Sequence, residues 1–295
     1  LEFRRVLFRS VGYNKCNEAN DRIDLSKYAS LKNVSIGDFC FRYQDVLNLT
    51  GLRSLESVTI GMNSFTKRYN TWGNNPNRAL YVKNCDKLKE LRIGCISFSD
   101  YSVIEIENVD KLEVLEIGDL NKESYNFYAA PLELRNLTKL QSLILGGESF
   151  ASSSGLVLEN LAKLTSIRLG DGALQFTSDY SDYNALPSLV MRNLRALTSI
   201  TTVPGSNSFH YPYHLTLYDM PKLTNVTLSN AFKYKSSVST NCNIGQMAEL
   251  FPSYCAFECW SDSPVLLNTE AITIGDNKCN ERNDRIDLRD RKSVV

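Results

Sequence analysis

The side chains that could carry chemistry in this 295-residue chain are few. The only two histidines, His210 and His214, stand four residues apart in HYPYH. That spacing can bind a metal on a helix, but Pro212 disfavours a helix, and the motif lacks the glutamate of a zinc protease. The cysteines Cys255 and Cys259 form a Cys-x3-Cys pair that no second ligand pair completes. We therefore expect no metal and no cofactor.

Composition and motifs disfavour several other classes of protein. The 33 basic and 33 acidic residues balance, and no basic stripe of the kind that neutralises nucleic-acid phosphates is present. No apolar run approaches the roughly 18 to 20 residues of a membrane span. The chain has no nucleophile elbow, phosphate-binding loop or dinucleotide fingerprint, and no repeated carboxylate cluster. We therefore expect no nucleic-acid partner, no membrane span within this chain and no catalytic activity.

The two ends of the chain differ from the rest. Residues 1–10 (LEFRRVLFRS) and 290–295 (DRKSVV) resemble translated sequencing adapters. We interpret both as artefacts and the remainder as an internal fragment of a longer protein. GYNKCNEANDRIDL (12–25) returns almost unchanged as GDNKCNERNDRIDL (275–288), which indicates either a tandem array of larger blocks or an assembly error.

A repeat organises residues 11–289. It is clearest in VIEIENVDKLEVLEIG (103–118), LELRNLTKLQSLILG (132–146) and LVLENLAKLTSIRLG (156–170). Each copy contains two short runs in which apolar residues alternate, as they do in half-buried strands. Two short strands per copy, joined by tight corners, predict a mostly β solenoid in which each coil contacts only its neighbours. We expect one continuous solenoid with an irregular, cysteine-containing insert at 230–264.

Two columns of residues recur at fixed places in the repeat, and we expect both to be structural. An asparagine precedes one corner, where its amide could satisfy buried backbone groups. A phenylalanine follows the second strand and is expected in a stacked aromatic spine. The asparagines are Asn84, Asn108, Asn136, Asn160 and Asn193, and the phenylalanines include Phe65, Phe98 and Phe150, together with Phe41, Phe209 and Phe232.

The copies resemble a known family. Ile60-Gly-Met-Asn-Ser-Phe65 and Ile93-Gly-Cys-Ile-Ser-Phe98 are similar to the I-G-x-x-A-F motif of leucine-rich repeat proteins of the BspA-like surface variety. The resemblance implies a leucine-rich-repeat-like, right-handed solenoid with two short parallel strands per coil. It also implies a role in recognition or adhesion at a cell surface or outside the cell.

Every second coil is lengthened, mostly after its I-G strand, so the added residues should leave the solenoid along one edge. These insertions are rich in Tyr, Asn and Ser, a composition that suits recognition, although plain solvated loops have it too. Stacked rings beside amides also suit the faces of sugars. Our candidate ligand-binding residues are Tyr69, Trp72, Tyr125, Tyr128, Tyr180, Tyr183, Tyr211 and Tyr213.

The insert at 230–264 is predicted to hold a short helix near residues 246–250. If the protein is secreted, a disulfide could form among Cys242, Cys255 and Cys259. The function we expect is non-catalytic binding of a protein or glycan ligand through the insertions. Alternatives are a structural array without a specific ligand and a solenoid enzyme acting on polysaccharide. Exposed coil faces at the ends would favour end-to-end self-association.

Overall fold

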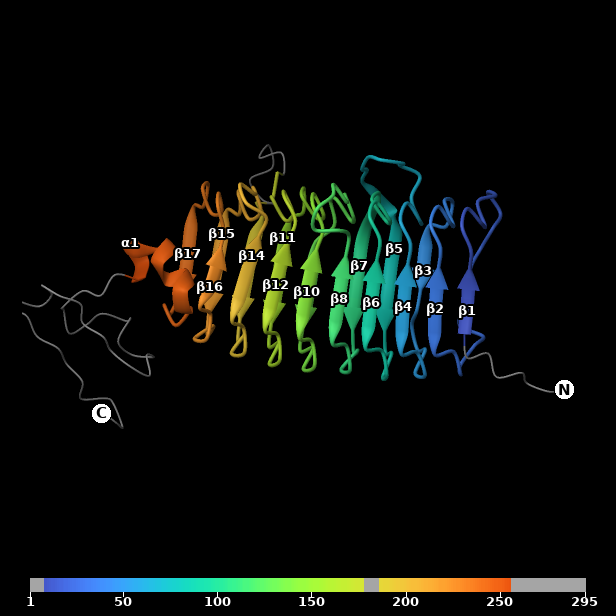
Figure 1. Ribbon diagram of the computed structural model, residues 1–295, viewed down its shortest axis with the longest axis horizontal. Coiled ribbons are helices and arrows are strands. Elements are labelled where there is room, and N and C mark those ends of the chain that lie inside the picture. Colours follow the sequence, from blue (N-terminus) through green and yellow to red (C-terminus); the bar gives the residue numbers. More distant parts are fainter. Residues whose placement is uncertain (1–7, 178–185, 256–295) are drawn as a thin grey trace, which may run out of the picture.

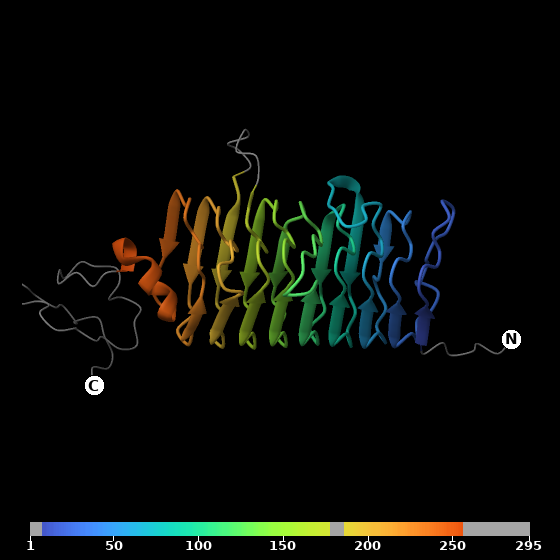
Figure 2. The ribbon, with the colours of Figure 1, turned by 45° about the horizontal axis from the view of Figure 1, so that its top comes forward.

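Residues 8–177 and 186–255, described by a computed structural model, form a parallel β-solenoid of about nine turns (Figure 1). The prediction of a mostly β solenoid with two parallel strands per coil is therefore confirmed. The strands stack side by side along one long axis, with β1 at one end and β17 at the other (Figures 1 and 2). Among the described residues, no helix is long and apolar enough to cross a membrane.

One face of the solenoid is an uninterrupted nine-stranded sheet. Its strands, in spatial order, are β1 (Phe8–Val11), β2 (Asn33–Ile36), β4 (Ser57–Ile60), β6 (Glu90–Ile93), β8 (Val114–Ile117), β10 (Ser142–Leu145), β12 (Ser166–Leu169), β14 (Ser199–Thr202) and β16 (Asn225–Thr227). Each strand pairs in register with the next, as Leu115 does with Leu143. β1 begins inside the segment 1–10 that we interpret as adapter-derived, and it pairs with β2 along its whole length.

The second face carries two separate sheets. The first contains β3 (Val46–Asn48), β5 (Asn75–Lys83) and β7 (Tyr101–Glu107). The second contains β9 (Leu132–Arg135), β11 (Gly155–Glu159), β13 (Ser188–Arg192), β15 (His214–Tyr218) and β17 (Ser237–Thr240). The core lies between the two faces, because alternate residues of each strand point inward. In β9, for example, Leu132 and Leu134 are fully buried, whereas Glu133 and Arg135 are exposed.

A stacked phenylalanine spine runs through the core just after the strands of the nine-stranded sheet. Phe65 lies 4.8 Å from Phe98 between ring centroids, and Phe98 lies 5.1 Å from Phe127. The expected members Phe41, Phe65, Phe98, Phe150, Phe209 and Phe232 all have a stacked phenylalanine neighbour, and Phe127 and Phe176 join them. All of these phenylalanines have positive φ, so the turn of each coil depends on a left-handed residue that the stacked rings hold in place.

The asparagine column occupies the opposite corner, where the chain passes from the second face to the nine-stranded sheet. Each of these asparagines has φ between 54 and 59°, a left-handed conformation that asparagine tolerates better than most residues. Their amides bond to one another and not to buried backbone: Asn160 Nδ2 donates to Asn136 Oδ1 at 2.9 Å, and Asn193 Nδ2 donates to Asn160 Oδ1 at 2.7 Å. Asn108 Nδ2 donates to Asn84 Oδ1 in the same way.

The second face is interrupted between β7 and β9. Elsewhere the corner asparagine donates its N–H to the next coil, as Asn84 does to Glu107 O at 3.1 Å and Asn136 to Glu159 O at 3.0 Å. Within the described residues, no backbone hydrogen bond joins Asn108 or β7 to β9. An open groove of about 480 Å³ lies there instead, lined by residues 102–108, 110, 131, 133 and 135–137.

The C-terminal part of the described chain covers the last coil. Up to Thr240 the range expected to be irregular still follows the coil pattern, because β17 pairs with β15. A 3-10 helix, η2 (Gly245–Leu250), and a single helical turn, α1 (Pro252–Cys255), then bury Met247 and Phe251. A disulfide joins Cys242 to Cys255, and Cys259 lies outside the described residues. We call residues 242–255 the C-terminal cap.

Candidate functional site

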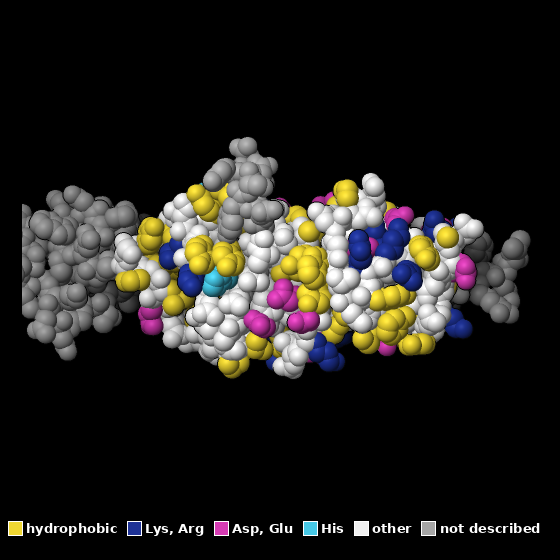
Figure 3. All heavy atoms as spheres, turned by 90° about the horizontal axis from the view of Figure 1, so that it is seen from above, with side chains coloured by type: hydrophobic (Ala, Val, Ile, Leu, Met, Phe, Trp, Pro, Cys, Tyr) yellow, Lys and Arg dark blue, Asp and Glu magenta, His cyan; other side chains and the backbone are white. Residues whose placement is uncertain are grey.

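Three of the candidate aromatic residues meet on the edge formed by the connections that follow the nine-stranded sheet, which we call the loop edge. Trp72 stacks on Tyr125 at 5.4 Å and packs at a tilt against Tyr128 at 4.8 Å between ring centroids, and the two tyrosine rings are 6.1 Å apart. Trp72 remains 46% exposed. Figure 3 looks onto this edge and shows hydrophobic side chains gathered near its middle. We call these three rings the central aromatic patch.

Trp72 reaches the patch from a distant coil. It lies in the long connection between β4 and β5, and it passes the short connection 94–100 of the next coil to meet the connection between β8 and β9. The Gly73 N–H donates to Ser99 O at 3.2 Å, and the Asn75 N–H donates to Asp100 O at 3.1 Å. These bonds fasten the insertion to the coil that it crosses.

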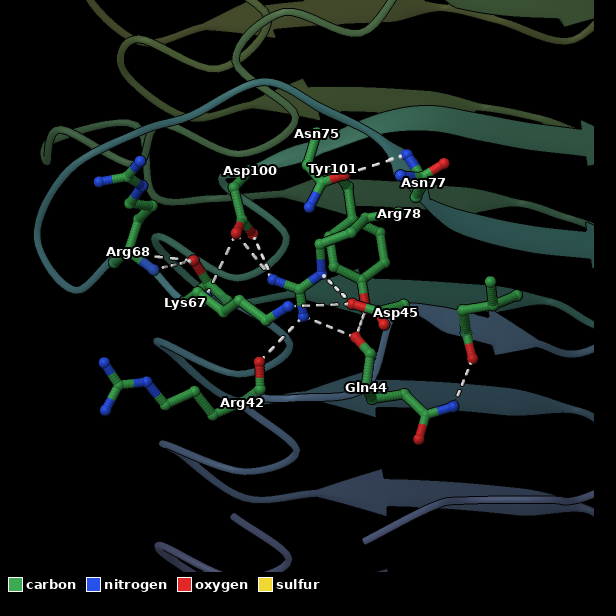
Figure 4. A network of polar contacts seen from close by, with 12 residues as sticks. Arg42, Gln44, Asp45, Lys67, Arg68, Asn75, Asn77, Arg78, Asp100 and Tyr101 are labelled. Carbon is green, nitrogen blue, oxygen red and sulfur yellow. Dashed lines mark hydrogen bonds and ion pairs between the residues drawn. The ribbon is translucent and has the colours of Figure 1, made fainter. Parts of the chain in front are cut away.

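A buried polar network anchors the end of this insertion (Figure 4). The Arg78 side chain is fully buried, and its Nη1 donates to both carboxylate oxygens of Asp100, at 2.8 and 2.7 Å. Nη2 donates to the backbone oxygens of Arg42 at 2.9 Å and Gln44 at 2.6 Å. Nε lies 3.5 Å from Asp45 Oδ1, close enough for an ion pair although it makes no hydrogen bond.

Tyr101 completes the network. The Arg78 guanidinium lies 4.5 Å from its ring centroid, and the Tyr101 hydroxyl donates to Gln44 O at 2.5 Å. Burial raises the pKa of Tyr101, so this hydroxyl keeps its proton and remains a donor. A charged group that is buried with an oppositely charged partner and with most of its hydrogen-bond positions filled can remain ionised inside a core.

Tyr125 and Tyr128 are positioned by the buried residues between them. Asn126 is buried and its Nδ2 donates to Gly94 O at 2.9 Å and to Ser97 O at 2.7 Å, while Phe127 enters the phenylalanine spine. The flanking tyrosines are therefore left at the surface. Burial raises the pKa of Tyr128, and a hydrogen bond with Thr177 offsets part of that rise.

Three carboxylates lie beside the patch on successive coils. The Tyr125 hydroxyl donates to Glu123 Oε2 at 2.7 Å, and Glu123 pairs with Gly147, the residue before Glu148. The Glu148 N–H in turn donates to Asp171 O at 2.7 Å. Partial burial raises the pKa of Glu148, and the negative charges of Asp171 and Glu123 raise it further. We call Glu123, Glu148 and Asp171 the acidic row.

The acidic row has no counter-charge from the described part of the chain. Within residues 8–177 and 186–255, no lysine or arginine lies at ion-pair distance from these three carboxylates. Lys122, the neighbour of Glu123, pairs with Asp119 at 3.1 Å. Burial and the bond to Glu123 also raise the pKa of Tyr125, as a negative environment requires.

Three further aromatic candidates lie elsewhere on the described part of the chain. Tyr69 packs 5.9 Å from Phe39, with the Arg42 guanidinium 4.5 Å from its ring centroid. Tyr211 stacks on Tyr234 at 4.8 Å. Tyr213 contacts His214 at 4.9 Å. Tyr180 and Tyr183 lie outside the described residues. Among the residues that the structure describes, the loop edge therefore presents separate aromatic clusters and not one continuous strip.

The two histidines do not share a site. His210 Nδ1 bonds with Asn230 O at 2.8 Å, whereas His214 Nδ1 bonds with the Ser237 hydroxyl at 2.7 Å. Among the described residues, no three acidic, histidine or cysteine side chains are grouped closely enough to hold a metal ion.

Comparison with known proteins does not extend this description. No family model, no curated protein and no solved structure matches the chain. The site must therefore be interpreted from its own geometry.

All three rings of the patch are among the residues expected from the sequence, whereas the residues that position and surround them are not. Neither Arg78 nor Asp100 was a candidate. The acidic row was missed because its members stand 25 and 23 residues apart and are of two types, so they form no visible column. The only available signal was that both spacings lie close to the 24 residues that separate the repeat copies 132–146 and 156–170.

Proposed function

We propose that this protein is a non-catalytic binding module that recognises a protein or glycan ligand through its loop edge, with the central aromatic patch as the main contact. The observation that carries the proposal is the exposed Trp72 ring, held against Tyr125 and Tyr128 by an insertion that crosses a whole coil. Large apolar side chains kept at a surface in fixed positions are typical of binding hot spots. Rigid rings also lose little conformational entropy when they bind.

The fold is compatible with this role. A solenoid of stacked coils can present insertions from several coils on one edge, where a ligand meets them together. The closer kinship with BspA-like leucine-rich repeat proteins is part of the proposal and rests on the I-G-x-x-Ser-Phe copies. Adhesion and a location at the cell surface or outside the cell come with that kinship. Fold and location alone would not establish a ligand.

The test compares variants of the patch with a matched control. Trp72→Ala and Tyr125→Ala remove rings of the patch, whereas Tyr13→Ala removes a ring that is 66% exposed at the first coil, outside the patch. Each protein would be passed over immobilised glycans and immobilised extracellular proteins, and its folding checked by thermal unfolding. We expect ligands of the wild type to be lost with Trp72→Ala and kept with Tyr13→Ala. Equal binding by all four folded proteins would contradict the proposal.

A structural array without a specific ligand is the second candidate. It is favoured by the uninterrupted nine-stranded sheet and by the phenylalanine spine, which together make a long, stiff element. End-to-end self-association belongs to this alternative. Analytical ultracentrifugation over a range of protein concentrations tests it: assembly that proceeds equally in wild type and Trp72→Ala, with no ligand bound by either, would favour the array.

A further inference from the structure

We propose that the central aromatic patch takes a positively charged side chain, arginine or lysine, from a basic segment of a protein partner, and that Glu123, Glu148 and Asp171 bind its charge. This inference rests on the proposed function and narrows it, because it selects a basic protein segment over a neutral glycan. The expected contact is a cationic group that stacks on the rings and bonds to the carboxylates.

The charge beside the patch favours a cationic ligand. The acidic row runs along three successive coils beside the patch and is held in line by the Glu123–Gly147 pairing and by the bond from Glu148 to Asp171. No basic side chain of the described residues neutralises it. Three like charges at one site repel each other, and a cation that arrives with a ligand removes that cost. Figure 3 shows acidic side chains beside the hydrophobic ones on this edge.

The rings of the patch also suit a cation. The electron-rich face of tryptophan or tyrosine attracts a guanidinium or ammonium group, and an adjacent carboxylate can bond the same group. The protein already contains this arrangement in its interior: Arg78 lies 4.5 Å from the Tyr101 ring centroid and is bonded to Asp100. At the patch, rings and carboxylates are present, and the ligand would supply the cation.

Tyrosines in two other aromatic clusters of the loop edge already lie beside a cation. Tyr69 has Arg42 at 4.5 Å from its ring centroid, and Tyr234 has Lys233 at 5.6 Å. These rings therefore have a cation from the chain itself. Trp72, Tyr125 and Tyr128 have no such contact among the described residues. The carboxylates are also not grouped as a metal site requires, which favours a larger organic cation.

The experiment measures binding of the whole chain to three immobilised probes by biolayer interferometry. The probes are a triarginine peptide, the matching tricitrulline peptide, and a neutral glucose hexasaccharide. Citrulline has nearly the shape of arginine but no charge, so the peptide pair isolates the charge. We expect the triarginine peptide to bind roughly tenfold or more tightly than the tricitrulline peptide, and less tightly as salt is raised.

Variants then locate the contact. Glu123→Gln/Glu148→Gln and Trp72→Ala should each weaken triarginine binding roughly tenfold. Asp110→Asn, which removes an exposed negative charge at the opposite corner, should leave that binding unchanged. Absence of triarginine binding in the wild type overturns the inference. Equal binding of the two peptides, or equal effects of the double variant and Asp110→Asn, overturns it as well.

The outcomes also separate this inference from the function on which it rests. Hexasaccharide binding that is lost in Trp72→Ala and kept in Glu123→Gln/Glu148→Gln would leave the patch a recognition site for glycans and overturn the cationic ligand. If Trp72→Ala changes binding to no probe and to no ligand found in the wider panel, both proposals fail together.

Discussion

Asp100 holds Arg78 with both of its carboxylate oxygens, at 2.8 and 2.7 Å from Nη1, inside the solenoid. The pair joins two coils, since Arg78 belongs to β5 and Asp100 directly precedes β7. The backbone oxygen of Asp100 also accepts the Asn75 N–H at the end of the insertion that carries Trp72. Stability and the placement of the exposed ring therefore depend on the same residue.

The first prediction concerns this pair. Asp100→Asn leaves the Arg78 charge buried without its main partner, and we expect the free energy of unfolding to fall by about 3 to 5 kcal/mol. Asp45→Asn is the control, because Asp45 is about half exposed and lies 3.5 Å from Arg78 Nε, so its loss should cost about 1 kcal/mol or less. Urea denaturation measures both, and equal losses would contradict the assignment of Asp100 as the main counter-charge.

The second prediction concerns pH. The raised pKa of Glu148 means that its ionised form is disfavoured in the folded state. Glu148 therefore costs no stability at low pH, where its carboxyl group is protonated. It lowers the free energy of unfolding as the pH rises through its folded-state pKa. We expect Glu148→Gln to match the wild type near pH 4 and to be more stable at pH 8, as measured by urea denaturation.

Salt supplies the control for this prediction. Concentrated NaCl screens the repulsion from Asp171 and Glu123 but leaves the burial cost of the carboxylate, so the advantage of Glu148→Gln at pH 8 should shrink and not vanish. An advantage of the variant that is the same at pH 4 and pH 8 would show that ionisation of Glu148 is not its cause.

The third prediction separates backbone conformation from hydrogen bonding in the asparagine column. Asn136 has φ of 59° and accepts a bond from Asn160 Nδ2. Asn136→Ala should cost about 1 to 2 kcal/mol because alanine is strained there. Asn136→Gly removes the same amide but tolerates the conformation, so it should cost clearly less. Thermal unfolding of both variants measures these losses. Equal losses would show that the hydrogen bonds between the asparagine amides provide the stabilisation, and not the backbone conformation.

The fourth prediction concerns the C-terminal cap. Cys242→Ser/Cys255→Ser removes a disulfide that joins residues 13 positions apart in the sequence. A disulfide across a loop of this length stabilises the folded state by about 3 kcal/mol, because it restricts the unfolded chain. We expect faster hydrogen exchange in η2 and β17, with strands such as β10 unaffected, because coils couple mainly to their neighbours. Wild-type protein under reducing conditions is the control and should behave like the double variant. Acceleration along the whole solenoid would contradict a local role for the disulfide.

Much of the fold could be predicted because it depends on local periodicity. The runs Leu132-x-Leu134 and Leu143-x-Leu145 lie in β9 and β10, and the phenylalanines stand where the repeat indicated. Phe127 and Phe176 were missed because they stand further from the ends of β8 and β12 than Phe65 stands from the end of β4. The asparagine partners were missed for another reason: a bond between residues one coil apart depends on how coils stack, which no single repeat contains.

The site was less predictable because its geometry depends on contacts between coils and on a buried charged residue. Trp72, Tyr125 and Tyr128 were chosen for their type, but their meeting depends on the path of a long insertion. That path is set by Arg78, a charged residue that composition alone places at the surface. The interior pairing with Asp100 joins residues 22 positions apart, on different coils. Such a contact follows from tertiary packing and not from periodicity.

The interruption between β7 and β9 has a mechanical consequence. At this level the nine-stranded sheet stays continuous through the β8–β10 pairing, whereas the second face has only the groove without backbone hydrogen bonds. Bending is therefore easiest here, in the direction that opens the groove. Flexure of the solenoid should therefore concentrate at this coil. Tyr125 and Tyr128 lie in the connection between β8 and β9, so such flexure would swing half of the patch relative to Trp72.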